Sequence, residues 1–92
     1  PMSAAPSTPT ADNTLDLRGM RVDDALALLE AFLDRMFGAG ETTAYVLHGV
    51  GSGALRDAVR TQLREHTRYV RDQRPGERDE GGERITVVHL VR

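Results

Sequence analysis

Apolar and polar residues alternate along the chain with two different periods, and these periods predict six elements in the order β-α-β-α-β-β. Apolar residues recur every three or four positions over residues 22–37 and again over residues 55–66, which is the spacing of an amphipathic helix. Shorter segments rich in Val, Thr, Ile and Tyr alternate apolar with polar residues, as strands do. The expected strands are residues 13–19, 42–47, 69–73 and 85–90.

The order of these elements predicts an α/β fold, a two-layer α+β sandwich in which two helices pack on a four-stranded mixed sheet. Right-handed crossovers bring both helices onto one face and leave the other face partly exposed, as a further candidate binding surface. If the first strand runs parallel to the strand that ends at Leu47, both carboxyl ends open on one edge. Residues 74–83 form a polar connection that we expect to be mobile. Charged residues in and beside this connection are expected only to solvate it: Glu77, Arg78, Asp79, Glu80, Glu83 and Arg84.

The start of the chain is rich in Pro, Ser, Ala and Thr, so residues 1–12 are expected to be a disordered leader or linker. Its first residues, Pro1 and Met2, look like a cloning remnant, and a linker-like start suggests a domain cut from the end of a longer protein. Residues 13–92 then form one domain. The chain has no cysteine and no apolar run that could cross a bilayer, so we expect no disulfide, no membrane partner and a cytoplasmic location.

The most informative stretch joins the second strand to the second helix and reads His-Gly-Val-Gly-Ser-Gly over residues 48–53. Gly49, Gly51 and Gly53 are expected to shape a phosphate-binding turn, because glycine tolerates positive φ and lets a ligand approach the backbone. The helix that follows offers free N–H groups and the positive end of its dipole. Three arginines recur every four residues along that helix and extend the site: Arg56, Arg60 and Arg64. The residues alone leave open a structural alternative, a tight connection that uses glycine for geometry only.

The distribution of charge favours an anionic ligand at this turn, although the net charge of the chain is −2. Residues 1–47 hold three arginines against seven acids, whereas residues 48–74 hold six arginines against three acids, a local net charge of +3. All twelve basic residues are arginine, which a GC-rich genome explains better than phosphate recognition does. The absence of lysine excludes a Walker-type phosphate loop. An aromatic content of 4% favours contacts with a nucleic-acid backbone over base stacking.

Three further side chains are candidates for chemistry. Asp16 and Arg18 stand at the carboxyl end of the first strand, where open α/β sheets carry their sites; the alternative is a solvent-side charge pair of little energetic weight. His48 ends the second strand and can donate to a phosphate or transfer a proton near neutral pH; the alternative is that it hydrogen-bonds the loop that it begins. His66 and His89 do not share a zinc-site spacing with His48, so no metal site is expected.

Two motifs and the chain ending together resemble the Smr (small MutS-related) domain. They are Leu-Asp-Leu-Arg-Gly at residues 15–19, His-Gly-Val-Gly-Ser-Gly-Ala-Leu-Arg at residues 48–56, and Gly81-Gly82 ahead of Ile-Thr-Val-Val at residues 85–88. The resemblance runs from about Asn13 to Leu90. It is closest to the version found at the C-terminus of the bacterial MutS paralogue that is linked to suppression of homologous recombination.

This resemblance implies a fold similar to the C-terminal domain of translation initiation factor three. It also implies nucleic-acid binding and, in many members, endonuclease or nicking activity. The family motif positions fall here on Asp16 and Arg18 in the first motif. In the second motif they fall on His48, Gly49, Gly51 and Gly53.

The favoured hypothesis is a nuclease domain that nicks DNA, either branched or double-stranded. The amides of Gly49–Gly53 and Arg56 would hold the phosphate, and Arg60 and Arg64 would grip its neighbours. Arg18 would offset charge in the transition state, and either Asp16 or His48 would activate water. Whether cleavage needs a divalent cation is left open.

Two other hypotheses remain. The domain could be a non-catalytic module that binds DNA, RNA or ribosomes and delivers an attached ATPase, with steeply salt-dependent binding and no cleaved product. Alternatively, it could bind another protein through the exposed face of the sheet.

Overall fold

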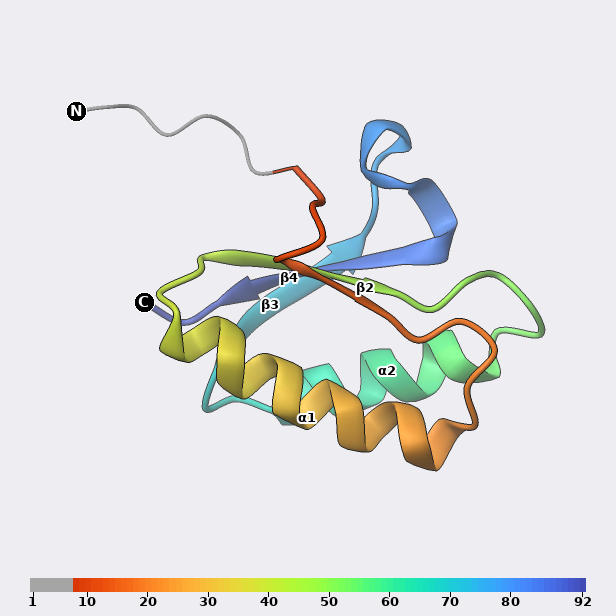
Figure 1. Ribbon diagram of the computed structural model, residues 1–92. Coiled ribbons are helices and arrows are strands. Elements are labelled where there is room, and N and C mark those ends of the chain that lie inside the picture. The colour runs from red at the N-terminus through yellow and green to blue at the C-terminus, as the bar shows by residue number, and fades with distance from the viewer. Residues whose placement is uncertain (1–7) are drawn as a thin grey trace.

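Four strands form one mixed sheet in the order β1-β2-β4-β3, and two helices lie against one face of it (Figure 1). The computed structural model describes residues 8–92, so the first seven residues of the expected leader lie outside the described residues. The elements are β1 (Thr14–Asp16), α1 (Val22–Gly38), β2 (Thr43–Leu47), α2 (Ala54–Glu65), β3 (Val70–Pro75) and β4 (Ile85–Leu90). The predicted α/β class, element order and placement of the helices are confirmed.

The first strand is shorter than the predicted residues 13–19, because the chain turns immediately after Asp16. There the backbone N–H of Arg18 donates to Asp16 Oδ1 at 3.1 Å instead of to a neighbouring strand. Ahead of the strand, the side-chain amide of Asn13 donates to the carbonyl of Thr8 at 2.9 Å. The described end of the expected leader is therefore hydrogen-bonded to the start of the sheet.

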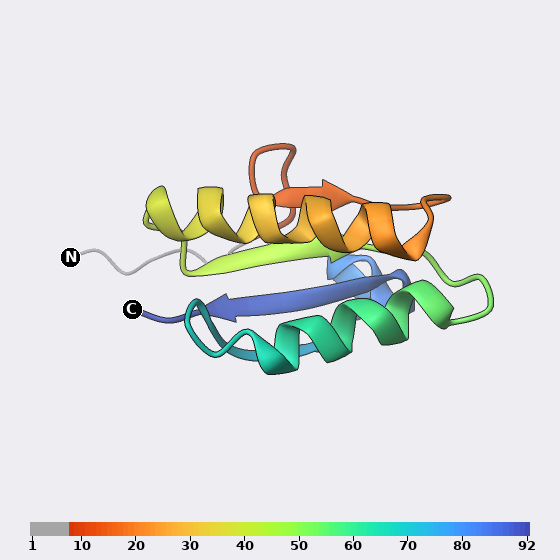
Figure 2. The ribbon, with the colours of Figure 1, turned by 90° about the horizontal axis from the view of Figure 1, so that it is seen from below.

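The main core lies between the sheet and the helices, with α1 beside β1 and β2 and α2 beside β4 and β3 (Figure 2). Alternate strand residues and one stripe of each helix contribute to it, as the apolar spacing predicted. The buried apolar residues are Leu17, Ala25, Leu29, Phe32, Leu33, Met36, Ala44, Val46, Val59, Leu63, Val70, Val88 and Leu90. Burying a side chain of this size contributes about 1.5–3 kcal/mol, so this layer is the main source of stability.

The C-terminal end of α1 is capped from the other end of the chain. The Arg92 guanidinium donates to the carbonyls of Met36 and Phe37 at 3.3 and 3.1 Å, and also to that of Glu41. It also stacks over the Phe37 ring, with 4.7 Å from Cζ to the ring centroid. The Met36 and Phe37 carbonyls also accept the backbone N–H groups of Glu41 and Gly40. The guanidinium therefore adds to a helix end that is already hydrogen-bonded, and a cation at this position interacts well with the helix dipole.

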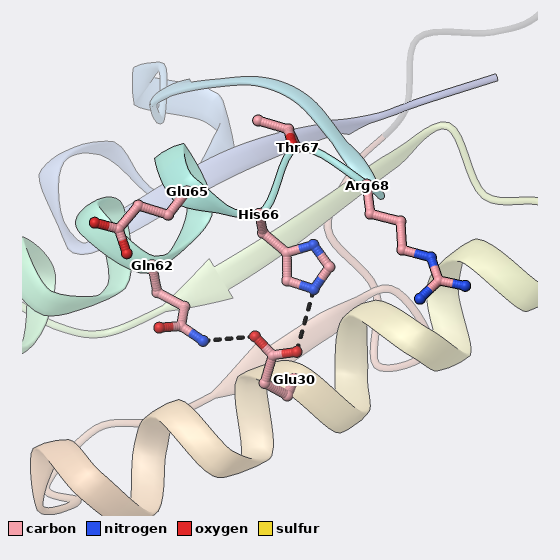
Figure 3. A pocket seen from close by; sticks show the side chains of 6 residues that line it. All are labelled: Glu30, Gln62, Glu65, His66, Thr67 and Arg68. Atoms are coloured by element: carbon pink, nitrogen blue, oxygen red, sulfur yellow. Dashed lines mark hydrogen bonds and ion pairs between the residues drawn. The ribbon is translucent and has the colours of Figure 1, made fainter.

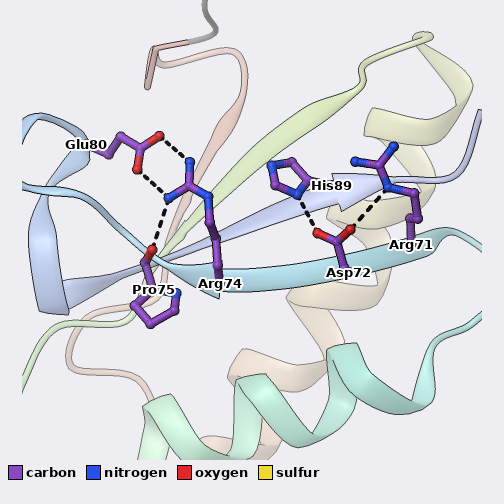
Figure 4. Close-up of polar contacts among 6 residues, drawn as sticks. All are labelled: Arg71, Asp72, Arg74, Pro75, Glu80 and His89. Carbon is purple, nitrogen blue, oxygen red and sulfur yellow. Dashed lines mark hydrogen bonds and ion pairs between the residues drawn. The ribbon is translucent and has the colours of Figure 1, made fainter.

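The face of the sheet turned away from the helices is less exposed than predicted. Tyr45, Ile85 and Val87 form a second, smaller cluster there, and each is at most 4% exposed. Farther along this face the surface is polar and carries Arg71, Asp72 and His89 (Figure 4). This arrangement leaves little apolar area for the protein-binding surface that was one of the three hypotheses.

The connection between β3 and β4 is more regular than predicted. It contains two short 3-10 helices, Arg78–Glu80 and Gly82–Arg84. Both carboxylate oxygens of Glu80 accept hydrogen bonds from Arg74 at 2.7 Å (Figure 4), and one of them also accepts the Glu77 N–H at 2.7 Å. The expectation that the charges of this connection only solvate it is therefore wrong for Glu80, whose carboxylate organises the turn.

Substituting Glu80→Gln should destabilise the fold in a pH-dependent way. Hydrogen bonding to Arg74 is the main reason why the pKa of Glu80 is lowered from an ordinary 4.5 to about 2. A carboxylate with a lowered pKa in the folded state stabilises the fold above its unfolded pKa, and this contribution is lost as the pH falls toward 2. Because the Arg74 side chain is 36% exposed, solvent screens the pair, and we expect a loss of about 1 kcal/mol near pH 7.

Urea denaturation of both proteins, near pH 7 and near pH 3, measures this effect. The difference between wild type and Glu80→Gln should shrink at the lower pH. Glu83→Gln, in the same connection but without an ion pair among the described residues, is the matched control and should leave stability unchanged. Equal losses in the two variants, or a loss that does not change with pH, would contradict the assignment.

Candidate functional site

The two sequence motifs meet at one edge of the sheet. Strands β1 and β2 are parallel, with Asp16 opposite Leu47, and the Leu17 N–H extends the ladder to the Leu47 carbonyl at 2.8 Å. Both strands therefore end at the same edge, as predicted. The side chain of Arg18 lies directly against the glycine turn, because a β-carbon added to Gly49 would be 3.3 Å from Arg18 Cγ. Figure 1 shows the β1–α1 and β2–α2 loops at the same end of the domain.

Asp16 and Arg18 form a two-pronged ion pair at this edge. Arg18 Nε donates to Asp16 Oδ1 at 3.0 Å, and Arg18 Nη2 donates to Oδ2 at 2.8 Å. Both side chains remain accessible, at 51% and 59% exposure respectively. The hydrogen bonds from Arg18 lower the pKa of Asp16, so this carboxylate is charged at neutral pH. The exposed charge pair is the structural alternative that the sequence left open, and it holds the Arg18 guanidinium in a fixed orientation at the surface.

The glycine turn is held in its shape by positive φ angles. Gly49, Gly51 and Gly53 have φ values of +81°, +44° and +90°, a region that other residues rarely adopt. Gly53 is the N-cap of α2. The positive φ angles expected of these glycines at the strand-to-helix turn are confirmed.

The free amide donors of the turn differ in part from those predicted. The N–H of Gly49 donates to the Arg84 carbonyl at 3.0 Å, and the N–H of Gly53 donates to the Val50 carbonyl at 3.2 Å. These two amides are therefore occupied within the fold. Neighbouring N–H groups of the turn and of the first turn of α2 make no hydrogen bond to residues 8–92: those of Val50, Gly51, Ser52, Leu55 and Arg56. The anion-binding capacity of the turn therefore depends on these donors.

His48 is buried beneath the turn, and only 5% of it is exposed. Its Nδ1 lies 2.8 Å from the Gly49 carbonyl oxygen, and its Nε2 lies 2.9 Å from the Thr86 hydroxyl. Burial is the main reason why the pKa of His48 is lowered, and the nearby charges of Arg60 and Arg56 act in the same direction. Both ring nitrogens are thus engaged inside the protein, which is the structural alternative that the sequence left open.

Thr86 is the residue of this site that the sequence prediction missed. It is fully buried on the helix-facing side of β4, and its hydroxyl oxygen also accepts a hydrogen bond from Arg60 Nε at 2.9 Å. The signal was present in the alternation of β4, because Thr86 shares its face with the buried Val88 and Leu90. A hydroxyl at such a position needs hydrogen-bond partners inside the protein.

The three arginines of α2 do not form a uniform exposed stripe. Arg60 is half-buried over Thr86, and its Nη2 is buried without a hydrogen-bond partner in the described part of the chain. Arg56 is also half-buried, pairs with Asp57 at 3.1 Å and lies over Gly53. Arg64 is exposed and makes no ion pair within residues 8–92. Of the three, Arg64 fits best the predicted role of an arginine free to contact a neighbouring phosphate.

A pocket between the helices lies at the far end of α2 and is lined by Glu30, Gln62, Glu65, His66, Thr67 and Arg68. Figure 3 shows the Glu30 carboxylate of α1 accepting from Gln62 at 2.5 Å and contacting His66 Nε2 at 3.1 Å. This pairing joins the two helices and has no contact with the glycine turn. Within the described residues, no group of three or more His, Asp or Glu side chains could hold a metal ion, and no helix is long and apolar enough to span a membrane.

The fold and site together define a class: a two-layer β-α-β-α-β-β domain with an Asp–Arg pair beside a glycine-rich strand-to-helix turn. The model of the Smr domain family matches residues 15–91, which include both motifs. The chain belongs to this family, as its resemblance to the family indicated.

Individual relatives agree with this assignment. The chain is 46% identical over 90 residues to "Endonuclease MutS2" of Anaeromyxobacter sp. strain Fw109-5. This alignment covers 97% of this chain and 11% of that protein. It is 46% identical over 76 residues to "Putative endonuclease MutS2" of Bacillus subtilis, covering 83% and 10%. The chain thus spans about a tenth of the length of these curated relatives.

Solved structures match as well. The crystal structure of the Smr domain of Thermus thermophilus MutS2 superposes with a TM-score of 0.83 at 39% identity, covering 87% of this chain and 99% of that one. YdaL, a stand-alone small MutS-related protein from Escherichia coli, gives a TM-score of 0.84 at 19% identity, covering 90% and 67%, and supports the fold alone.

Substituting Gly49→Ala should disturb the site and the stability of the fold together. Alanine at this position would have to adopt a φ of +81°, and its β-carbon would lie only 3.3 Å from Arg18 Cγ. We expect the free energy of unfolding to fall by about 1–3 kcal/mol, the cost of a left-handed non-glycine residue. Gly38→Ala is the control, because nothing lies within 4 Å of its β-carbon position and its φ is not positive. Urea denaturation compares the two, and an unchanged stability in Gly49→Ala would show that the turn does not need this backbone conformation.

Proposed function

We propose that this domain binds nucleic acid through the phosphate backbone and nicks DNA as an endonuclease. One observation carries the proposal: the Asp16–Arg18 pair lies against Gly49 at the edge where both parallel strands end. A guanidinium is thereby held beside a turn with unoccupied amide donors. The relatives named endonuclease MutS2 support a nuclease of this type.

In this proposal the free N–H groups of the turn and of the first turn of α2 bind the scissile phosphate. The positive end of the helix dipole adds to this attraction. The exposed Arg64 contacts a phosphate farther along the strand. Because contacts of this kind do not read bases, the domain should bind with little sequence preference.

Arg18 is proposed to stabilise the charge that develops on the phosphate during cleavage. Its planar guanidinium suits a phosphate as well as a carboxylate, so it can transfer hydrogen bonds from Asp16 to the substrate. That transfer frees the Asp16 oxygens, and the carboxylate then accepts a proton from the attacking water. As the water oxygen bonds to phosphorus, the P–O bond to one sugar oxygen breaks, and that oxygen leaves with a proton taken from solvent. His48 is proposed to position the turn, because both of its nitrogens are already bonded inside the protein.

A nicking assay on supercoiled plasmid tests this proposal in magnesium, in manganese and with a chelator. Asp16→Asn keeps the shape of the side chain but removes the carboxylate charge, and Arg18→Lys keeps the positive charge but removes the two-pronged guanidinium. Each should reduce nicking at least about tenfold, since one stabilising donor at a reaction centre is worth about 100-fold or more. Glu65→Gln and Arg35→Lys, on exposed helix positions, are the matched controls.

Loss of nicking in the site variants alone would support the nuclease and show whether a cation is required. Equal nicking in all proteins would sink the assignment, because the activity would then be a contaminant.

A second candidate function is a binding module without catalysis, which delivers an attached ATPase of a longer protein to DNA or to RNA and ribosomes. The observation that favours it is that neither candidate general base, Asp16 or His48, is free to accept a proton. Asp16 has a lowered pKa and both of its oxygens bonded, and His48 is buried. A carboxylate with a low pKa is a weak base, whereas phosphate binding needs no base at all.

Binding of a fluorescent DNA duplex as a function of salt tests the phosphate contacts, which both functions share. Arg64→Ala should weaken binding and reduce the slope of log affinity against log salt by about one, which is the loss of one phosphate contact. Arg35→Ala removes a charge from α1 and should leave the slope unchanged. A slope that is the same in Arg64→Ala and wild type would exclude Arg64 from the interface.

A further inference from the structure

We propose that Thr86 is a positioning residue whose hydroxyl locks His48 in one neutral tautomer and orients Arg60, and so fixes the glycine turn against α2. The inference rests on the proposed function, since what Thr86 would position is the phosphate-binding turn. It adds a residue that lies outside both motifs, 38 positions from His48 in the chain.

The hydrogen-bond partners allow only one consistent arrangement of protons with a neutral His48. The carbonyl of Gly49 can only accept, so His48 Nδ1 must carry the proton that it shares at 2.8 Å. In a neutral ring Nε2 is then an acceptor, and the Thr86 hydroxyl must donate to it at 2.9 Å. The Thr86 oxygen remains free to accept from Arg60 Nε, which can only donate, also at 2.9 Å. The direction of donation is therefore Arg60 to Thr86 to His48 to Gly49.

Burial and charge favour the same arrangement. His48 and Thr86 are 5% and 0% exposed, so water cannot readily replace either partner. A proton added to His48 Nε2 would face the Thr86 hydroxyl, and it would place a second cation beside Arg60, with Arg56 also nearby. The same effects lower the pKa of His48. The ring is thus suited to holding structure and not to exchanging protons with substrate.

The consequence is a mechanical link between segments that are distant in the sequence. The chain of hydrogen bonds begins on α2 at Arg60, passes through β4 at Thr86 and ends in the turn at Gly49. The side-chain amide of Gln73 in β3 also donates to the Arg60 carbonyl at 2.7 Å, and this bond anchors the part of α2 around Arg60 to the sheet. Loss of the Thr86 hydroxyl would release both the ring and the guanidinium while the apolar core stays intact.

Two substitutions separate the hydroxyl from the shape of the side chain. Thr86→Val has nearly the same volume without the hydroxyl, whereas Thr86→Ser keeps the hydroxyl with a smaller side chain. The imidazole signals of His48 in nitrogen-15 NMR report its tautomer, and a fluorescent DNA duplex of about 30 base pairs reports binding. Urea denaturation checks that each variant is folded.

We expect wild type and Thr86→Ser to show a protonated Nδ1 and an unprotonated Nε2 near pH 7. In Thr86→Val the Nε2 signal should shift, because it loses its donor. DNA binding should weaken by about tenfold or more in Thr86→Val, the usual effect of breaking a hydrogen bond to a charged group, and recover in Thr86→Ser.

Three results would overturn the proposal. They are a wild-type His48 with a protonated Nε2, binding by Thr86→Val equal to that of a wild type that does bind DNA, and equal loss of binding in the Ser and Val variants. The first requires no variant, so the test stands even if Thr86→Val does not fold. If no protein binds DNA but the tautomer shift is seen, the lock is supported and the proposed function fails instead.

Discussion

The parallel pairing of β1 with β2 is the constraint on which the rest of the domain depends. A short strand opposite the end of β2, with Asp16 level with Leu47, brings two motifs some thirty residues apart to a single edge. An antiparallel arrangement of the same strands would leave the Asp16–Arg18 pair and the glycine turn at opposite ends of the sheet. The crossover helix α1 makes the parallel pairing reachable, and its buried stripe against β1 and β2 holds it in place.

Most of the fold could be predicted from the sequence because apolar residues recur with a regular period along its helices and strands. The stripes of α1 and α2 and the β character of residues 85–90 left few alternatives, and each helix and strand was found close to its expected place. The errors occurred where backbone and side chains bond locally. Asp16 ends β1 early by accepting the Arg18 N–H, and Glu80 organises a connection expected to carry only solvated charges. Hydrogen bonds of this kind have no periodic signature.

The candidate site was predictable in composition and less so in detail. The glycines, Asp16 and Arg18 are marked by motif and position, and the structure brings them together. Which amides are free could not be known, since the Gly49 N–H is taken by a carbonyl 35 residues away in the chain. Burial of His48 was likewise invisible, because it depends on the packing of α2 over β4. In a sequence, a histidine beside a glycine turn suggests a catalytic role. Only the tertiary contacts show that both of its ring nitrogens are hydrogen-bonded inside the protein.

The carbonyl of Arg84 accepts the N–H groups of both His48 and Gly49, each at 3.0 Å. One oxygen atom at the end of the β3–β4 connection therefore supports the start of the glycine turn. Insertions and deletions in surface connections are usually regarded as neutral drift. Here a change in the length of residues 76–84 would move that oxygen, so the shape of the glycine turn is tied to the length of a connection that lies outside both motifs.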